Sequence, residues 1–226
     1  MFSGPSRTVD QMEQDFRELV STVRNEHLRG LLEALLGTHS PTWARFRDAP
    51  AAKHYHQAYE HGLLEHTVTV AQAVSALSAI FPGLDRDLAV SGALLHDIGK
   101  LDTYETVEGR IEMTDDGRLQ GEIVLGYTLI RAELDAQRDF PHELRQALLH
   151  IILSHHGSLE HGSPVVPCTR EATLVHMADN LGSKLGSFDR IERGLEAGAQ
   201  WADYDRGIGT SAYFGLEGAA PALLAA

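Results

Sequence analysis

The apolar run from Ala93 to Leu95 ends directly in His96 and Asp97, within the stretch ALLHDIGK. A helix in which apolar residues continue to its last turn is expected to lie in the core. Imidazole and charged groups at the end of such a run are costly to bury unless they are paired or bind a metal ion. The stretch therefore predicts a buried helix with a polar or metal-binding cluster at its end.

The chain has 226 residues, of which 43% are hydrophobic, so it can form a sizeable core. No apolar run approaches the roughly 20 residues that span a bilayer. The first residues lack the pattern of a signal peptide. The single cysteine, Cys168, excludes an internal disulfide and fits a reducing compartment. We therefore expect a cytosolic globular protein with no membrane segment.

The net charge of -13 argues against broad electrostatic capture of nucleic acid, which needs a basic surface. It does not exclude a nucleic-acid substrate, because bound metal ions reverse the local potential. The chain also has 13 histidines, and histidine is the commonest metal ligand. Their spacing is therefore informative.

Apolar residues recur at helical spacing over most of the chain, which predicts an all-α fold. The expected helical segments are 9–36 (one helix or a pair), 54–80, 85–97 with Asp85 as N-cap, 122–137, 141–155 and 171–197. The turn residues of 106–118 predict a small hairpin or an irregular loop. A loop is expected over 157–169, and the tail from Gly198 is expected to be irregular but packed.

Four short stretches place candidate metal ligands beside apolar residues. Each candidate alone has a simpler interpretation, such as a helix cap, a helix C-terminus that favours imidazolium, or a hydrogen-bonded pair. The order of residue types, in a helical context, favours one shared site. In chain order the candidates are His66, His96 with Asp97, His155 with His156, and Asp179.

These residues resemble the pattern H…HD…D of the HD-domain metal-dependent phosphohydrolases. The chain is most similar to the YhaM-type 3′–5′ exoribonucleases in five stretches: APAAKHYHQAYEHGLLEHT, GALLHDIGK, HIILSHHGSLEHGSPVVPCTREA, HMADNLGSKL and WADYDRGIG. The similarity implies an all-α HD-domain helical bundle with a small hairpin or loop insertion. It implies a helical N-terminal extension over 1–49, the HD domain over 50–216 and a tail over 217–226.

The resemblance also implies a metal centre. One ion would bind His66, His96, Asp97 and Asp179, and a second would bind His155 and His156, with Asp97 bridging the two. Mixed imidazole and carboxylate donors favour manganese, or iron, cobalt, nickel or zinc, over magnesium. Whether one or two ions bind is left open.

Two residues are expected to act in catalysis beside these ions, Asp97 and Lys100. Metal ions neutralise a phosphodiester and lower the pKa of a bound water. Lys100 would pair with a phosphate oxygen as a point charge. Its alternative role is that of a solvated lysine at a helix end.

The chain departs from the family pattern at several positions. Glu122 stands where the family has a histidine that binds the second ion. A carboxylate can bind the same metals. Alternatively, Glu122 only begins a helix, where its negative charge stabilises the helix N-terminus. His56 is followed by Gln57 instead of a second histidine, and His61 stands in place of a glycine. We expect His56, His61 and Arg206 to contact substrate, although Arg206 could equally serve packing.

The family usually carries an N-terminal OB-type domain that binds single strands, whereas here the helical segment 9–36 precedes the HD region. A firm grip on long RNA is therefore not expected. The apolar segment 9–36 either covers its own core or pairs with another copy, which leaves a homo-oligomer open.

The leading functional hypothesis is a metal-dependent phosphodiesterase that acts on nucleotides or short single-stranded oligonucleotides, as a 3′–5′ exonuclease. The alternatives are a nucleotidase or deoxynucleoside triphosphate phosphohydrolase, a di-iron oxygenase, and a binding module without catalysis.

Overall fold

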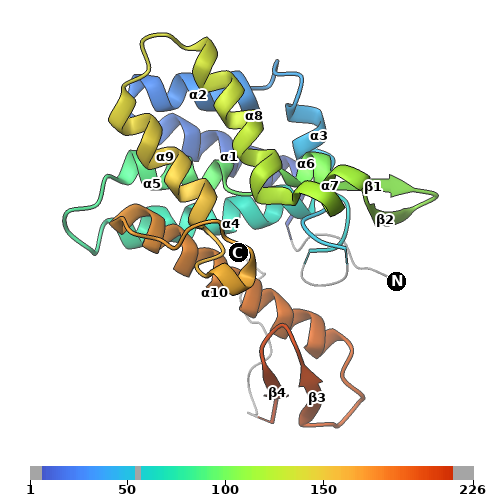
Figure 1. Cartoon of the computed structure of the whole chain (residues 1–226). Helices are drawn as coiled ribbons and strands as arrows, with labels where there is room; N and C mark the ends of the chain where they lie inside the picture. The colour runs from blue at the N-terminus through green and yellow to red at the C-terminus, as the bar shows by residue number, and fades with distance from the viewer. Residues whose placement is uncertain (1–6, 54–56, 216–226) are drawn as a thin grey trace. The chain divides into compact units, whose positions relative to one another are not determined.

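The computed structural model describes residues 7–53 and 57–215, which form two compact units, Met1–Gly182 and Ser183–Ala226 (Figure 1). The elements of the first unit are α1 (Val9–Thr22), α2 (Glu26–Leu36), α3 (Trp43–Asp48), α4 (Gly62–Ser78), α5 (Arg86–Leu95), α6 (Lys100–Thr103), β1 (Tyr104–Val107), β2 (Arg110–Met113), α7 (Asp115–Gln120), α8 (Glu122–Ala136), α9 (His142–Ser154), the 3-10 turn Leu159–His161 and most of α10 (Arg170–Arg193). The predicted all-α class is confirmed.

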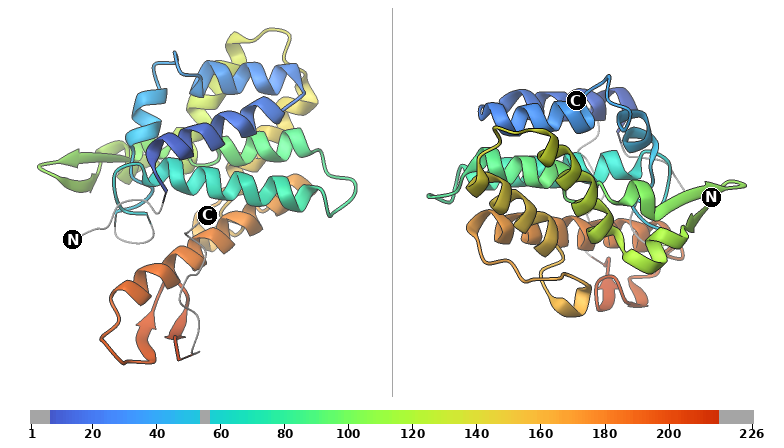
Figure 2. Two further views of the ribbon diagram at one scale, coloured as in Figure 1. Left: turned by 180° about the vertical axis from the view of Figure 1, so that it is seen from behind. Right: turned by 45° about the horizontal axis from the view of Figure 1, so that its top comes forward.

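The N-terminal segment forms the helix pair α1 and α2. The break falls at Asn25, whose side-chain oxygen accepts hydrogen bonds from the backbone N–H groups of His27 and Leu28 at the start of α2. α1 packs on α4 and α2 packs on α5 (Figure 2). The pair therefore covers the two helices that lead into the HD motif.

Helix α5 is the central element of the first unit, and it contacts α1, α2, α4 and α9. Every residue from Leu88 to Leu95 is buried. Asp85 caps the helix as predicted, because its side chain accepts a hydrogen bond from the N–H of Leu88. A helix that is apolar on all sides needs neighbours on all sides, and α5 has them.

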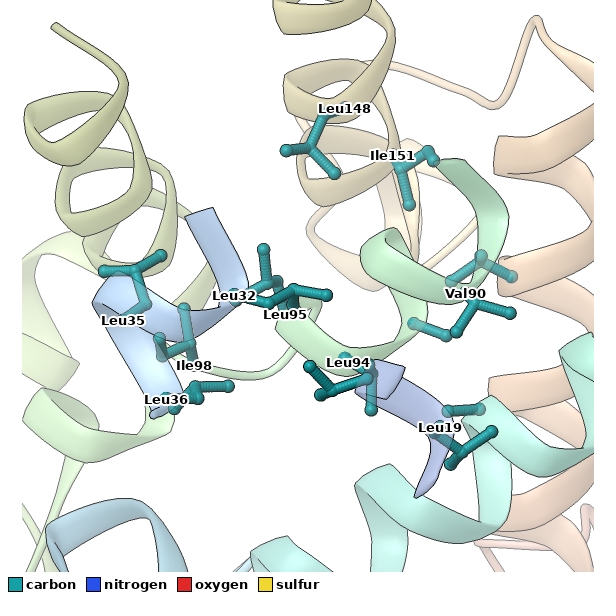
Figure 3. Close-up of a cluster of buried hydrophobic side chains, with 14 of the residues drawn as sticks. Leu19, Leu32, Leu35, Leu36, Val90, Leu94, Leu95, Ile98, Leu148 and Ile151 are labelled. Carbon is teal, nitrogen blue, oxygen red and sulfur yellow. The ribbon is translucent and has the colours of Figure 1, made fainter. Parts of the chain in front are cut away.

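Side chains from helices far apart in the sequence meet in one apolar core. Leu19 and Leu32 from the N-terminal pair lie near Leu94 and Leu95 of α5, and Leu148 and Ile151 of α9 complete the cluster (Figure 3). The N-terminal pair thus shares its core with the HD helices. The domain boundaries at residues 49 and 216 stay predictions.

The predicted insertion is an antiparallel hairpin of β1 and β2, with its turn at Glu108 and Gly109. Both turn residues have positive φ, which glycine adopts without cost. The loop expected to run to 118 is instead interrupted by α7, which Thr114 caps by accepting a hydrogen bond from the N–H of Gly117.

Several other boundaries differ from those predicted. Helix α4 begins at Gly62, not near residue 54, and residues 54–56 lie outside the described part of the chain. The short helix α3 was not foreseen, because its six residues offer too little periodicity. The prediction of an irregular tail from Gly198 was wrong, since β3 (Trp201–Asp205) and β4 (Thr210–Tyr213) form a hairpin.

The second unit contains the end of α10 and this β3–β4 hairpin. Arg190 donates a hydrogen bond of 2.7 Å to Asp205, and the rings of Phe188 and Phe214 lie 6.3 Å apart. The rings of Trp201 and Tyr213 pair across the hairpin at 4.8 Å. Among the described residues, no helix combines the length and the apolar character needed to cross a membrane.

Truncating a side chain of the N-terminal pair tests whether the pair belongs to the core. Leu32 is fully buried, so Leu32→Ala should lower the free energy of unfolding by about 2–5 kcal/mol. The matched control is Leu119→Ala, because Leu119 is 84% exposed and should change it by less than about 0.5 kcal/mol. Urea unfolding measures both. If Leu32→Ala changed the free energy of unfolding as little as Leu119→Ala does, the helix pair α1 and α2 would not contribute to the core.

Candidate metal centre

The end of α5 brings the two residues of the HD motif into the interior. His96 follows the last residue of α5, and His96 and Asp97 are 2% and 3% exposed. Gly99 then packs against the start of α8, where a Cβ atom would overlap the carbonyl oxygen of Glu122. The glycine is needed for this close approach, and it brings Glu122 next to the HD motif.

The first group of candidate ligands combines three helices. Nε2 of His66, on α4, lies 3.3 Å from Nε2 of His96 and 3.0 Å from Oδ1 of Asp179 on α10. Oδ2 of Asp97 lies 3.3 Å from each of the two Nε2 atoms. Four donor atoms therefore converge from residues that span more than one hundred positions of the chain, from His66 to Asp179.

A second group lies on the other side of Asp97. Nε2 of His156 is 2.9 Å from Oε1 of Glu122. His155 completes this group, because Glu122, His155 and His156 each offer one donor atom and these three atoms lie within 4.8 Å of one another. Oδ1 of Asp97 lies 3.7 Å from Nε2 of His155. The two oxygens of Asp97 thus face different groups, which is the position of a bridging carboxylate.

Backbone carbonyls orient the imidazole rings of this centre. Nδ1 of His96 lies 2.7 Å from the carbonyl oxygen of Ala93, and Nδ1 of His155 lies 2.7 Å from that of Ile152. A neutral ring that donates from Nδ1 leaves a lone pair on Nε2, the atom that faces the centre. Nε2 of His155 is buried and has no hydrogen-bond partner among the described residues. A buried acceptor of this kind fits a metal ligand.

Comparison with known proteins identifies the family of the chain. Residues 63–183 match the model of the HD domain family. The chain belongs to the HD domain family. It is 34% identical over 188 residues to the 3'-5' exoribonuclease YhaM of Bacillus subtilis (strain 168), an alignment that covers 81% of this chain and 57% of that protein. It is 32% identical over 198 residues to the 3'-5' exoribonuclease YhaM of Shouchella clausii (strain KSM-K16), which covers 86% and 58%.

The resemblance inferred from the sequence is thereby confirmed. The chain spans less than two thirds of the length of either relative. No solved structure matches the chain significantly.

The pKa values of His96 and His155 are shifted in opposite directions. Burial of His96 opposes its protonation, but the carboxylates of Asp97 and Asp179 outweigh this effect and raise the pKa of His96 to about 9. Burial and the positive charges of His96 and His156 lower the pKa of His155 to about 4. His155 is therefore neutral at pH 7, as a metal ligand must be.

The carboxylates stay ionised despite their burial. Burial alone would raise the pKa of Asp97, but Lys100 and His96 hold it well below its usual range. The pKa of Glu122 is lowered in the same way, because Lys100 and a hydrogen bond with His156 outweigh its burial. A hydrogen bond with His66 and the charge of His96 likewise lower the pKa of Asp179 against its burial.

Lys100 is part of the same network. Its Nζ donates a hydrogen bond of 2.8 Å to Oδ2 of Asp97 and lies 4.0 Å from Oε2 of Glu122. Burial would lower its pKa, but these two carboxylates raise it above the usual lysine value, so Lys100 carries a positive charge. The side chain is only 10% exposed, which does not fit the alternative of a solvated lysine at a helix end.

Three further residues were predicted to contact the substrate. Nδ1 of His61 lies 2.9 Å from the carbonyl oxygen of Arg47 and 3.4 Å from Asp48, both on α3. Arg206 belongs to the second unit, after β3. His56 lies outside the described residues. The substrate roles of these residues stay predictions.

Tyr104 is a neighbour of the centre that sequence reasoning missed. Its hydroxyl is close enough to Glu122, Lys100 and Asp97 that their charges act on it, and burial together with Glu122 raises its pKa. The only signal in the sequence was its position four residues after Lys100, at the start of the hairpin.

The raised pKa of His96 predicts how metal affinity depends on pH. A metal ion binds the deprotonated ring, so below about pH 9 it must displace a proton from His96, and the apparent affinity should rise about tenfold per pH unit toward that value. The aspartates are already ionised and add no dependence in this range. Calorimetric titration with Mn²⁺ from about pH 6.5 to about pH 8.5 measures the slope. An affinity independent of pH would contradict the assignment of His96 as a ligand.

Proposed function

We propose that the protein is a metal-dependent phosphohydrolase that cleaves phosphodiester bonds of nucleotides or short single-stranded oligonucleotides from the 3′ end. The observation that carries the proposal is the placement of Asp97 between two groups of donor atoms. The exoribonuclease activity named for the two relatives supports this substrate class.

In this proposal one ion binds His66, His96, Asp97 and Asp179. A second ion would be held by Glu122, His155 and His156, and Asp97 would be available to both ions. Two groups of His and acidic residues with donor atoms within 4.8 Å of one another support both sites. Imidazole and carboxylate donors suit manganese, with iron, cobalt, nickel or zinc as alternatives. Ions bound there would neutralise the phosphate and lower the pKa of the attacking water.

Lys100 has two tasks in the proposed reaction. Its ammonium group has three donors, and one of them holds Oδ2 of Asp97 in place. The remaining donors are available to a non-bridging phosphate oxygen on the substrate. The positive charge of Lys100 thus orients the bridging carboxylate and offsets charge on the phosphate.

The net charge of -13 favours mononucleotides as a second candidate substrate class. Affinity for a long polyanion grows with the number of basic side chains that contact it. A nucleotidase or a deoxynucleoside triphosphate phosphohydrolase needs only one bound nucleotide. Parallel assays on mononucleotides and oligonucleotides distinguish the two activities.

Hydrolysis of an oligonucleotide labelled at its 5′ end tests the proposal directly. With Mn²⁺ the protein should shorten the strand from its 3′ end, and Asp97→Asn should reduce the rate by about a thousandfold or more, because the shared ligand loses its charge. The control is Asp102→Asn, since Asp102 pairs with Arg45 in a partly exposed ion pair and its loss should change the rate by less than about twofold. No hydrolysis with manganese, cobalt, nickel or iron would contradict the proposal.

Substitution of Glu122 tests the second ion. Glu122→Gln keeps the shape of the side chain but removes the charge, so the number of bound Mn²⁺ ions should fall from two to one. Glu122→His supplies the imidazole that related proteins carry at this position and should restore two. Metal analysis by mass spectrometry after desalting gives the count. Two ions retained in Glu122→Gln would show that Glu122 is not a ligand.

A further inference from the structure

A cavity of about 320 Å³ opens directly beside the second donor group. Glu122 and His156 belong both to the lining of this cavity and to the group of candidate ligands. Three larger cavities of about 700, 780 and 540 Å³ share no residue with either donor group. The smaller cavity is therefore the one that is continuous with the proposed reaction site.

The walls of the cavity come from several segments, among them β1, β2, α7, α8 and the 3-10 turn after α9. Ile123 and Val124, at the start of α8, and Met113, at the end of β2, supply apolar surface. Tyr104, at the start of β1, supplies an aromatic ring. The 3-10 turn Leu159–His161 closes another side, and its last carbonyl oxygen lies 2.9 Å from Nδ1 of His156. The turn thus joins the cavity wall to a candidate ligand.

The charges around the cavity indicate which part of a substrate it accepts. The described residues that line it include no lysine and no arginine, so within the cavity a phosphate is attracted chiefly toward His156, at the end shared with the proposed second ion. Lys100, the cation of the site, lies outside the lining and binds Asp97. A phosphate is therefore favoured next to Lys100 and Asp97, and an uncharged group is favoured inside the cavity.

We infer that this cavity binds the 3′-terminal nucleoside of the substrate, with Tyr104 stacking on its base. This inference rests on the proposed function. A volume near the lower end of the roughly 300–1,000 Å³ of small-molecule pockets has room for one nucleoside. Apolar walls with one aromatic ring suit a nucleobase, because every base offers a face for stacking. The 5′ oxygen of the bound nucleoside then leads to the scissile phosphate between the two donor groups.

Binding of the terminal nucleoside in this cavity would lead the protein to release one nucleotide at a time from the strand. Water adds to phosphorus, the bond to the 3′ oxygen of the preceding nucleotide breaks, and that oxygen takes up a proton. The product is a nucleoside 5′-monophosphate whose base has occupied the cavity. A cavity that holds one nucleoside therefore favours cleavage at the terminal phosphodiester.

Variants that change the cavity test the inference, when their hydrolysis of two esters with the same leaving group is compared. The first is the p-nitrophenyl ester of thymidine 5′-monophosphate, and the second is methyl p-nitrophenyl phosphate, which has no nucleoside. Val124→Trp fills the cavity from a residue that is 42% exposed, and Tyr104→Leu removes the stacking ring. Both variants should raise KM for the nucleoside ester by about tenfold with little change in kcat, and Val124→Trp should leave kcat/KM for the methyl ester within about twofold.

The matched control is Thr128→Trp, because Thr128 is exposed on the same helix and does not line the cavity. It should behave as the original protein with both esters. An unchanged KM in Val124→Trp, or an equal loss on both esters, would overturn the inference. Circular dichroism and melting temperature show whether each variant is folded.

A binding measurement separates this inference from the proposed function. Calorimetry with thymidine 5′-monophosphate and the Mn²⁺-loaded protein requires no turnover. Binding that Val124→Trp weakens by about tenfold, in a protein that hydrolyses neither ester, would support the nucleoside site and contradict the phosphohydrolase proposal. Binding that is the same in both proteins would overturn the nucleoside site whatever the activity.

Discussion

The buried carboxylate of Asp97 is the group on which the centre of this protein depends. It is 3% exposed, yet it stays ionised because His66, His96 and Lys100 surround it within 3.3 Å. An isolated charge at this depth would be strongly destabilising, and removal of any partner leaves part of that cost uncompensated. The three helices that supply or precede these groups, α4, α5 and α6, are therefore coupled through one residue.

The fold brings the second donor group to Asp97 through close backbone contact. Gly99 and Gly126 face each other between the HD motif and α8, and a side chain at Gly99 would collide with the backbone there. This contact places Glu122 4.0 Å from Lys100 and lets His156 reach it at 2.9 Å. The glycine of the HD motif thus has a structural task, which is to allow α8 to approach.

Features that depend on the spacing of apolar residues, on cap residues or on the motifs shared with the HD family could be predicted from the sequence. The buried end of α5 and the Asp85 cap followed from periodicity and cap residues, and the grouping of His66, His96, Asp97 and Asp179 followed from the resemblance to the HD family. The hairpin of β3 and β4 was missed. Trp201 and Tyr204 are largely exposed, so β3 lacks the alternation of buried and exposed residues that marks a strand. Tyr104 was missed because its proximity to Glu122 arises from the packing of α6, which directly precedes Tyr104, on α8, and no local pattern reveals this tertiary contact.

We propose above that Asp97 is shared by two metal ions bound at the two donor groups. Anomalous diffraction from crystals of the Mn²⁺-loaded protein tests it most directly. We expect two peaks about 3.5–4 Å apart on either side of the Asp97 carboxylate, one near His66, His96 and Asp179 and the other near Glu122, His155 and His156. A single peak, or two ions that do not share Asp97, would contradict the claim.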